Sequence, residues 1–88
     1  MGIDFDSFMN DENREKILRA VRGISPDFPE QDLKPDLILK NIGGWDSMNS
    51  VNFIISLEED FHLTPGLIDF SGEESLADVI LELQRHIQ

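Results

Sequence analysis

The residue with the clearest chemical potential is Ser47, which lies in the segment Gly43-Gly44-Trp45-Asp46-Ser47-Met48. An amphipathic pattern begins at this serine, so we expect Ser47 at the first turn of a helix. The unpaired N–H groups and the positive dipole end of a helix start favour a phosphate. Ser47 is therefore suited to carry a phosphodiester, although Ser47 or Asp46 could instead serve only as the N-cap.

Other catalytic constellations do not emerge from the sequence. Asn49 stands where a Gly-x-Ser-x-Gly elbow needs glycine. His62 and His86 lack metal-ligand spacing and are expected on the surface near helix C-termini. The neighbouring acids at 58 and 59 would not face each other on a helix, which favours a solvated acidic face over acid/base chemistry. We therefore predict neither a metal site nor an enzyme; a hydrolase would need a histidine within reach of Ser47.

Composition narrows the classes of partner. The 88 residues suffice for one domain, and 7 basic against 18 acidic residues give a net charge of −11. This charge disfavours nucleic acid and anionic membranes and favours basic protein surfaces. The chain has no cysteine, no apolar run of about 20 residues and no signal-peptide pattern. We expect a monomeric cytoplasmic protein that does not insert into a membrane.

Three segments have helical periodicity. The first runs from about Asp11 to Arg22, with Asn10 or Asp11 as its cap and Gly23 as its stop. The second runs from about 47 to 61, and its crowded apolar residues predict a largely buried helix. The third follows a capping box formed by Ser75 and Asp78.

The connections carry further expectations. Prolines break the chain in residues 25–46, and the apolar residues there should lay this long loop across the core. An irregular or helical turn is expected over residues 67–70. Residues 1–10 are interpreted as an extension whose aromatic side chains pack on the body. The sequence thus predicts an all-α fold of three longer helices and one short helix, with a long loop between the first two.

Residues 42–61 and the segment from Ser75 to Ile80 resemble the acyl carrier protein family. The chain has Asp46-Ser47-Met48 where that family has Asp-Ser-Leu, then an apolar-studded helix and an acidic run before Phe61. The resemblance covers roughly residues 12–87 and implies a four-helix carrier domain over residues 11–88, preceded by the N-terminal extension.

The resemblance also implies a function. Ser47 would carry a covalent 4'-phosphopantetheine arm, donated by coenzyme A through a phosphopantetheinyl transferase. The arm would hold acyl groups as thioesters and present them to acyl-loading, condensing or acyl-transfer enzymes with basic surfaces. Asp46 would assist the transferase complex, and the partner contacts implied are Met48, Val51, Glu58, Glu59 and Asp60.

Some positions depart from the family pattern. Asn49 and Asn52 replace acids common in fatty-acid carriers, which indicates a specialised fatty acid, polyketide or related pathway. Trp45 could shield the arm or anchor a partner, and packing of the loop is favoured. The alternative to a carrier is an acidic helical interaction module without a prosthetic group.

Overall fold

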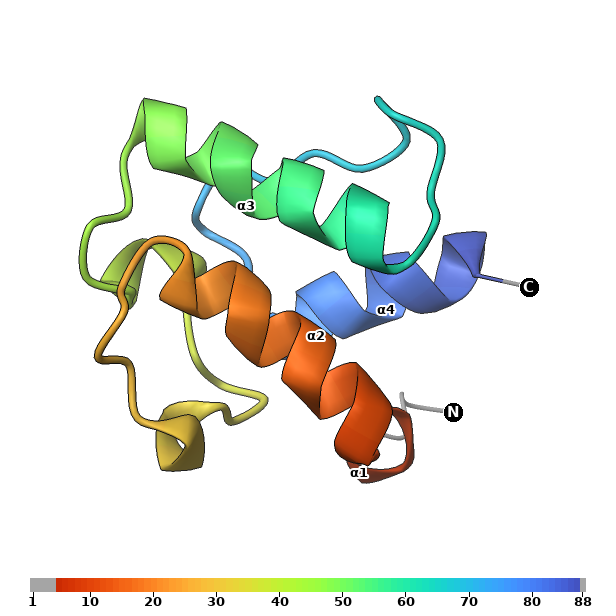
Figure 1. The fold of residues 1–88 in the computed structure, drawn as a ribbon, viewed down its shortest axis with the longest axis horizontal. Helices are drawn as coiled ribbons and strands as arrows, with labels where there is room; N and C mark the ends of the chain where they lie inside the picture. Colours follow the sequence, from red (N-terminus) through yellow and green to blue (C-terminus); the bar gives the residue numbers. More distant parts are fainter. Residues whose placement is uncertain (1–4, 88) are drawn as a thin grey trace.

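The computed structural model describes residues 5–87 and is helical (Figure 1). Its α-helices are α1 (Phe5–Phe8), α2 (Asp11–Arg22), α3 (Ser47–Asp60) and α4 (Leu76–His86). Two 3-10 turns, η1 (Glu30–Asp32) and η2 (Leu39–Asn41), lie in the long connection. The described residues contain no strand, so the all-α prediction is confirmed.

The ends of the long helices follow from their capping residues. Asn10 caps α2 by accepting the N–H of Asn13 at 2.9 Å, and Gly23 is the C-cap. At α4 the Ser75 side chain accepts the N–H of Asp78 while the Asp78 side chain accepts the N–H of Ser75. Both ends of a capping box are therefore present, as predicted.

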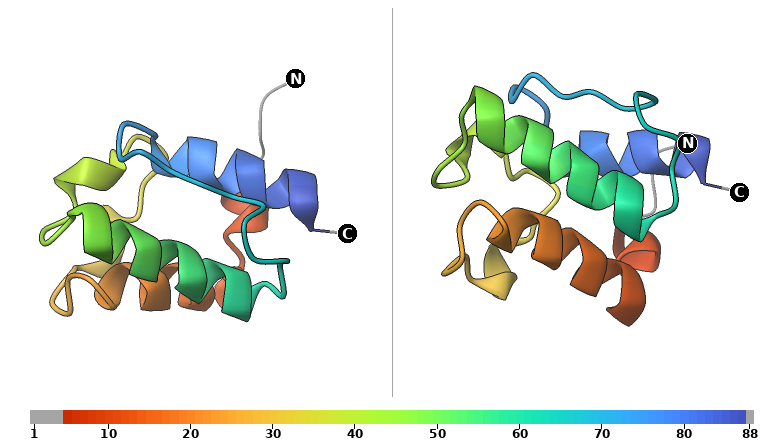
Figure 2. Two further views of the ribbon diagram at one scale, coloured as in Figure 1. Left: turned by 90° about the horizontal axis from the view of Figure 1, so that it is seen from above. Right: turned by 45° about the horizontal axis from the view of Figure 1, so that its top comes forward.

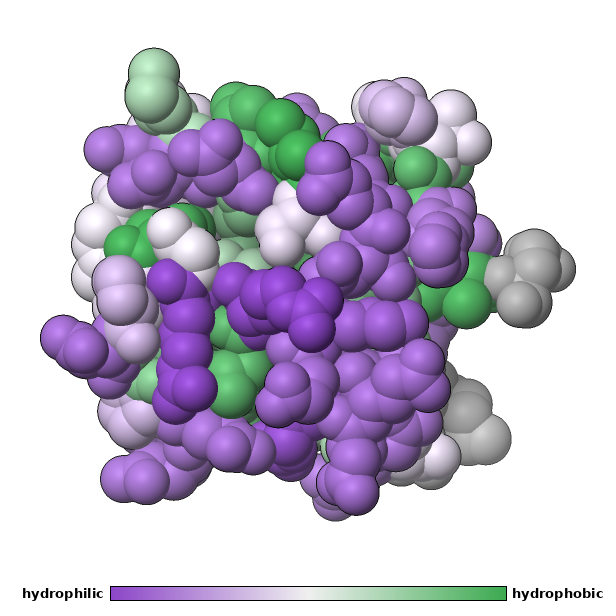
Figure 3. Space-filling model, in the orientation of Figure 1, coloured by the Kyte–Doolittle hydropathy of each residue, from purple (hydrophilic) through white to green (hydrophobic). Residues whose placement is uncertain are grey.

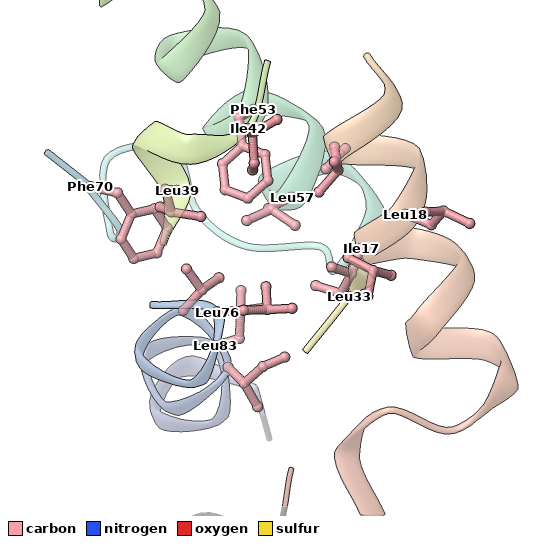
Figure 4. Packing of buried hydrophobic residues seen from close by; sticks show 14 of the residues in the cluster. Ile17, Leu18, Leu33, Leu39, Ile42, Phe53, Leu57, Phe70, Leu76 and Leu83 are labelled. Carbon is pink, nitrogen blue, oxygen red and sulfur yellow. The ribbon is translucent and has the colours of Figure 1, made fainter. Parts of the chain in front are cut away.

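One hydrophobic core joins the three long helices (Figure 4). Ile17 comes from α2, Phe53 from α3 and Leu83 from α4, and all three side chains are fully buried. The long connection contributes Leu39 and Ile42, which are as buried as the helical residues. The loop therefore lies across the core, as its apolar residues predict. None of the helices within residues 5–87 has the length and apolar character to cross a membrane.

Residues 35–40 pair with residues 72–77, and we call this pairing the loop clasp. The Leu39 N–H donates to the carbonyl of Glu74 at 3.0 Å, and the Leu76 N–H donates to the carbonyl of Leu37 at 2.7 Å. Ile38 and Ser75 form an isolated antiparallel bridge. These bonds satisfy backbone groups that would otherwise be buried without partners, and they hold the long loop against the start of α4.

The short helix lies before the three long helices and not over residues 67–70. Of the two forms expected at 67–70, the irregular one is present, with Ile68 and Phe70 buried. A one-turn helix forms instead at Phe5–Phe8, within the predicted N-terminal extension. This α1 lies beside α4 (Figure 2). The Phe8 ring stacks on the Phe61 ring, with centroids 6.0 Å apart. The expected packing of the extension is confirmed for its described part.

Candidate functional site

Asp46, and not Ser47, caps the start of α3. Asp46 has extended backbone angles, and its Oδ1 accepts the N–H of Asn49 at 2.7 Å. The Asn49 side chain reaches back and donates to the carbonyl of Gly44, also at 2.7 Å. The Asp46 cap thus satisfies one open N–H group of the helix, and the Asn49 side chain ties the first turn of α3 to the preceding loop. From the sequence, Asn49 is interpreted as a missing glycine of an elbow motif and as a missing acid, and its position three residues after Asp46 is the available signal for its contact.

Gly44 makes the tight approach to α3 possible. Its φ is +88°, which a residue with a side chain rarely adopts, and a Cβ here would lie 3.1 Å from the carbonyl oxygen of Ile24. The chain can therefore turn directly beside the end of α2 and enter α3. This turn places Ser47 at the first helical position.

The Ser47 side chain is exposed and has no hydrogen-bond partner among residues 5–87. The backbone N–H groups of Ser47 and Met48 also have no hydrogen-bond partner among these residues. Asp46 accepts only the next two N–H groups, those of Asn49 and Ser50. A free hydroxyl thus lies beside two free backbone donors at the positive end of a 14-residue helix. The arrangement can accept a phosphodiester without breaking an existing interaction.

The other serines of α3 are less suited to this role. The Ser50 hydroxyl donates to the carbonyl of Ser47 at 2.9 Å. Ser56 lies in the third turn, where the backbone N–H groups are already used in the helix. Both side chains are half-buried, so Ser47 alone combines exposure with free neighbouring donors.

Trp45 packs the loop against the core, as favoured from the sequence. Its ring meets that of Phe53 edge to face, with centroids 5.6 Å apart. Its indole nitrogen would lie 2.8 Å from a Cβ at position 72, a space that exists because that residue is glycine. Trp45 therefore joins the approach to Ser47 with the end of the loop clasp.

The prediction that α3 is largely buried is wrong. Met48, Val51 and Ile55 are 73%, 52% and 43% exposed. Their spacing places them on one side of α3, and we call them the apolar stripe. Figure 3 shows hydrophobic surface between hydrophilic atoms in the region of α3. Helical periodicity identified the apolar residues but could not tell a core face from an exposed one.

The acidic run after the stripe does not form one exposed face. Glu58 is 8% exposed, and its carboxylate accepts the N–H of Gly66 at 2.9 Å, which ties the following loop to α3. Asp60 pairs with Arg19 of α2 at 2.9 Å. Only Glu59 is exposed without such a contact. The prediction of a solvated acidic face is therefore wrong for Glu58, whose partner here is internal.

Both histidines lie far from Ser47. His62 follows α3, whose 14 residues separate it from the serine by about 20 Å. His86 lines the same surface hollow as His62. The serine–histidine pair that a hydrolase would need is not formed. In the part of the chain that the structure describes, no three His, Asp or Glu side chains are arranged to hold a metal ion.

Comparisons with protein-family models, with curated proteins and with solved structures gave no match. The resemblance to acyl carrier proteins therefore rests on the residues of the chain alone.

Proposed function

We propose that the protein is an acyl carrier that bears a phosphopantetheine arm on Ser47 and delivers acyl intermediates to partner enzymes. The observation that carries this proposal is the division of roles at the start of α3. Asp46 caps the helix, so the Ser47 hydroxyl is left exposed and unbonded within the described residues. A serine needed only for capping would have its oxygen on a backbone N–H.

The surroundings of Ser47 suit the attachment. The free N–H groups of Ser47 and Met48 can donate to phosphate oxygens, and no described contact of the Ser47 side chain has to be broken. When attached, the arm would supply a thiol that holds an acyl group as a thioester. The chain's own contribution is to fix the attachment point through Asp46, Asn49 and Gly44.

The surface beside Ser47 suits transient docking. The apolar stripe starts one residue after the serine and runs along α3. Exposed apolar residues beside acids offer a partner a hydrophobic contact, while the charge of −11 speeds encounter with basic surfaces. We place the transferase and the acyl-handling enzymes on this surface, contacting Met48, Val51 and Glu59. The proposed setting is cytoplasmic.

The direct test is an intact mass before and after incubation with coenzyme A, magnesium and a broad-specificity phosphopantetheinyl transferase. The parent chain and Ser50→Ala should each gain one phosphopantetheinyl group, and Ser47→Ala should gain none. A parent chain that stays unmodified while folded, with two transferases of different specificity, would contradict the proposal.

The apolar stripe also supports a second candidate, an interaction module without a prosthetic group. Such a module would use Met48, Val51 and Ile55 and would not need the serine. Ser47→Ala and Val51→Asp separate the two candidates in a complementation assay. A carrier loses function with either change, whereas a module loses function only with Val51→Asp.

A further inference from the structure

A separate hollow lies at the end of the molecule remote from Ser47, where α3 and α4 finish and α1 passes into α2. Its volume is about 520 Å³. Phe8, Phe61 and Ile87 form apolar walls, and the polar lining includes Lys16, His62 and His86. A hollow of about 350 Å³ adjoins it and shares Phe8 and Ile87. Concave, mostly apolar sites of this size with a few convergent polar groups are typical of small-molecule sites.

The lining has an unusual charge for this chain. Acids make up 18 of the 88 residues, yet none of the carboxylates within residues 5–87 lines either hollow. The cationic Lys16 and both histidines of the chain do line the larger one. Glu12 and Glu82 approach Lys16 and His86 at 3.5 and 3.6 Å from outside the lining. The groups that face the larger hollow can therefore donate hydrogen bonds to an anion.

His62 has a backbone conformation with positive φ that is unfavourable for a residue with a side chain. The Leu63 N–H donates to the carbonyl of Glu58 at 2.8 Å, which closes α3 in a Schellman motif. His62 is the left-handed residue of this motif, with φ of 58°. Glycine is the usual residue there, because a side chain is disfavoured at positive φ. A histidine that lines a hollow from this strained position points to a role for its ring.

Aromatic contacts hold the walls in place. Phe8 stacks on Phe61, and the Lys16 ammonium lies 4.9 Å from the centre of the Phe61 ring. The apolar wall and the cationic group are thus fixed next to each other. A ligand that satisfies both needs an apolar body with an anionic head.

We propose that this hollow binds a free aliphatic carboxylate, for which octanoate is the probe. The carboxylate binds Lys16 and the two imidazoles, and the chain lies along Phe8, Phe61 and Ile87. The site does not involve Ser47, so it is independent of the proposed carrier function and can be tested on the unmodified chain.

The test is a titration of the isotope-labelled chain with sodium octanoate, followed by amide chemical shifts. We expect saturable shifts concentrated at Phe8, Lys16, His62 and His86, with much weaker binding of acetate and of 1-octanol. Binding of 1-octanol as tight as that of octanoate would overturn the proposal, because the carboxylate would then have no role. Shifts that never saturate would overturn it as well.

Variants distinguish recognition from general packing. Lys16→Gln should weaken octanoate binding about tenfold, the size expected for one charge-assisted hydrogen bond. His62→Gly relieves the positive φ, so this variant should fold at least as stably as the parent while binding octanoate several-fold more weakly. Lys40→Gln, a change in the loop clasp, is the matched control and should bind like the parent. Equal losses in Lys16→Gln and Lys40→Gln would contradict the site.

Discussion

At the scale of single residues, Asp46 and Ser47 are neighbours with different relations to the fold. Asp46 bonds a backbone N–H that the helix leaves open, whereas the Ser47 side chain bonds no described residue. A change at Asp46 should therefore lower the stability of the fold, whereas a change at Ser47 should abolish the modification and leave the stability nearly unchanged.

Replacing each residue by alanine tests this separation. Asp46→Ala removes the N-cap of α3 and should lower the free energy of unfolding by about 1 kcal/mol, or the melting temperature by roughly 4–8 °C. Ser47→Ala should change the free energy of unfolding by less than about 0.5 kcal/mol. Thermal melts of the two variants check this, and a Ser47→Ala variant as unstable as Asp46→Ala would show that the serine is structural.

A second feature at the scale of single residues is the carboxylate of Glu74, which accepts hydrogen bonds from the N–H groups of Ser71 and Gly72 and so stabilises the turn over residues 71–74. Its burial acts to raise the pKa, but hydrogen bonds from the N–H groups of Ser71, Glu74 and Gly72 and from the Ser71 hydroxyl lower the pKa below 4.5. A carboxyl whose pKa is lowered by folding stabilises the native state above its unfolded pKa. That contribution is lost as the pH falls through the lowered folded pKa.

Glu74→Gln should therefore destabilise the protein most at neutral pH. The difference in melting temperature between parent and variant should shrink as the pH falls below the ordinary value of 4.5. Melts across this range measure it, with the exposed Glu59→Gln as control. A difference that does not vary with pH would mean that the Glu74 charge does not stabilise the turn.

At the scale of elements, the loop clasp connects the approach to Ser47 with the start of α4. Gly72 and Gly66 both have positive φ, at +109° and +93°. A Cβ on Gly72 would lie 2.8 Å from the Trp45 indole nitrogen, while a Cβ on Gly66 meets nothing within 4 Å. An alanine at either position would therefore be strained at positive φ, and the two positions differ in what the added methyl group would displace.

Gly72→Ala should be more destabilising than Gly66→Ala, because it adds a steric clash to the shared strain. It should also shift the emission of Trp45, the single tryptophan of the chain, to longer wavelength as the indole moves toward water. Gly66→Ala should leave the emission unchanged. Equal emission in both variants would contradict the packing of Trp45 on residue 72.

The ends of helices could be predicted from the sequence, whereas the exposure of their faces could not. The bounds of α2 and the start of α4 followed from Asn10, Gly23 and the Ser75 capping box because caps are local. The exposure of Met48 and the burial of Glu58 depend on which elements cover α3, and no local pattern encodes that. The free Ser47 hydroxyl could be proposed from sequence, but the choice of Asp46 as the cap required coordinates.

At the scale of the whole molecule, charge is the dominant property. Most basic residues already have internal partners, such as Arg19 with Asp60 and Lys40 with Glu73. The excess acidic groups, which give the net charge of −11, therefore repel one another within a small molecule and destabilise the folded state. Ions that screen this repulsion should stabilise the fold.

Added salt should raise the melting temperature at neutral pH. The screening length falls from about 30 Å at 0.01 M to about 8 Å at 0.15 M salt, and the longer distance exceeds the extents of the molecule, 31 × 28 × 22 Å, in two directions. Melts in sodium chloride, with sucrose of equal osmolality as control, check this. A melting temperature that is unmoved by salt would show that self-repulsion is not a significant strain.

Whether Ser47 is the attachment point of a prosthetic arm is decided by mapping the modified residue by peptide fragmentation after the transferase reaction. We expect one phosphopantetheinyl group per chain, located on Ser47. A group on Ser50 or Ser56, or a folded chain that no transferase modifies, would contradict it.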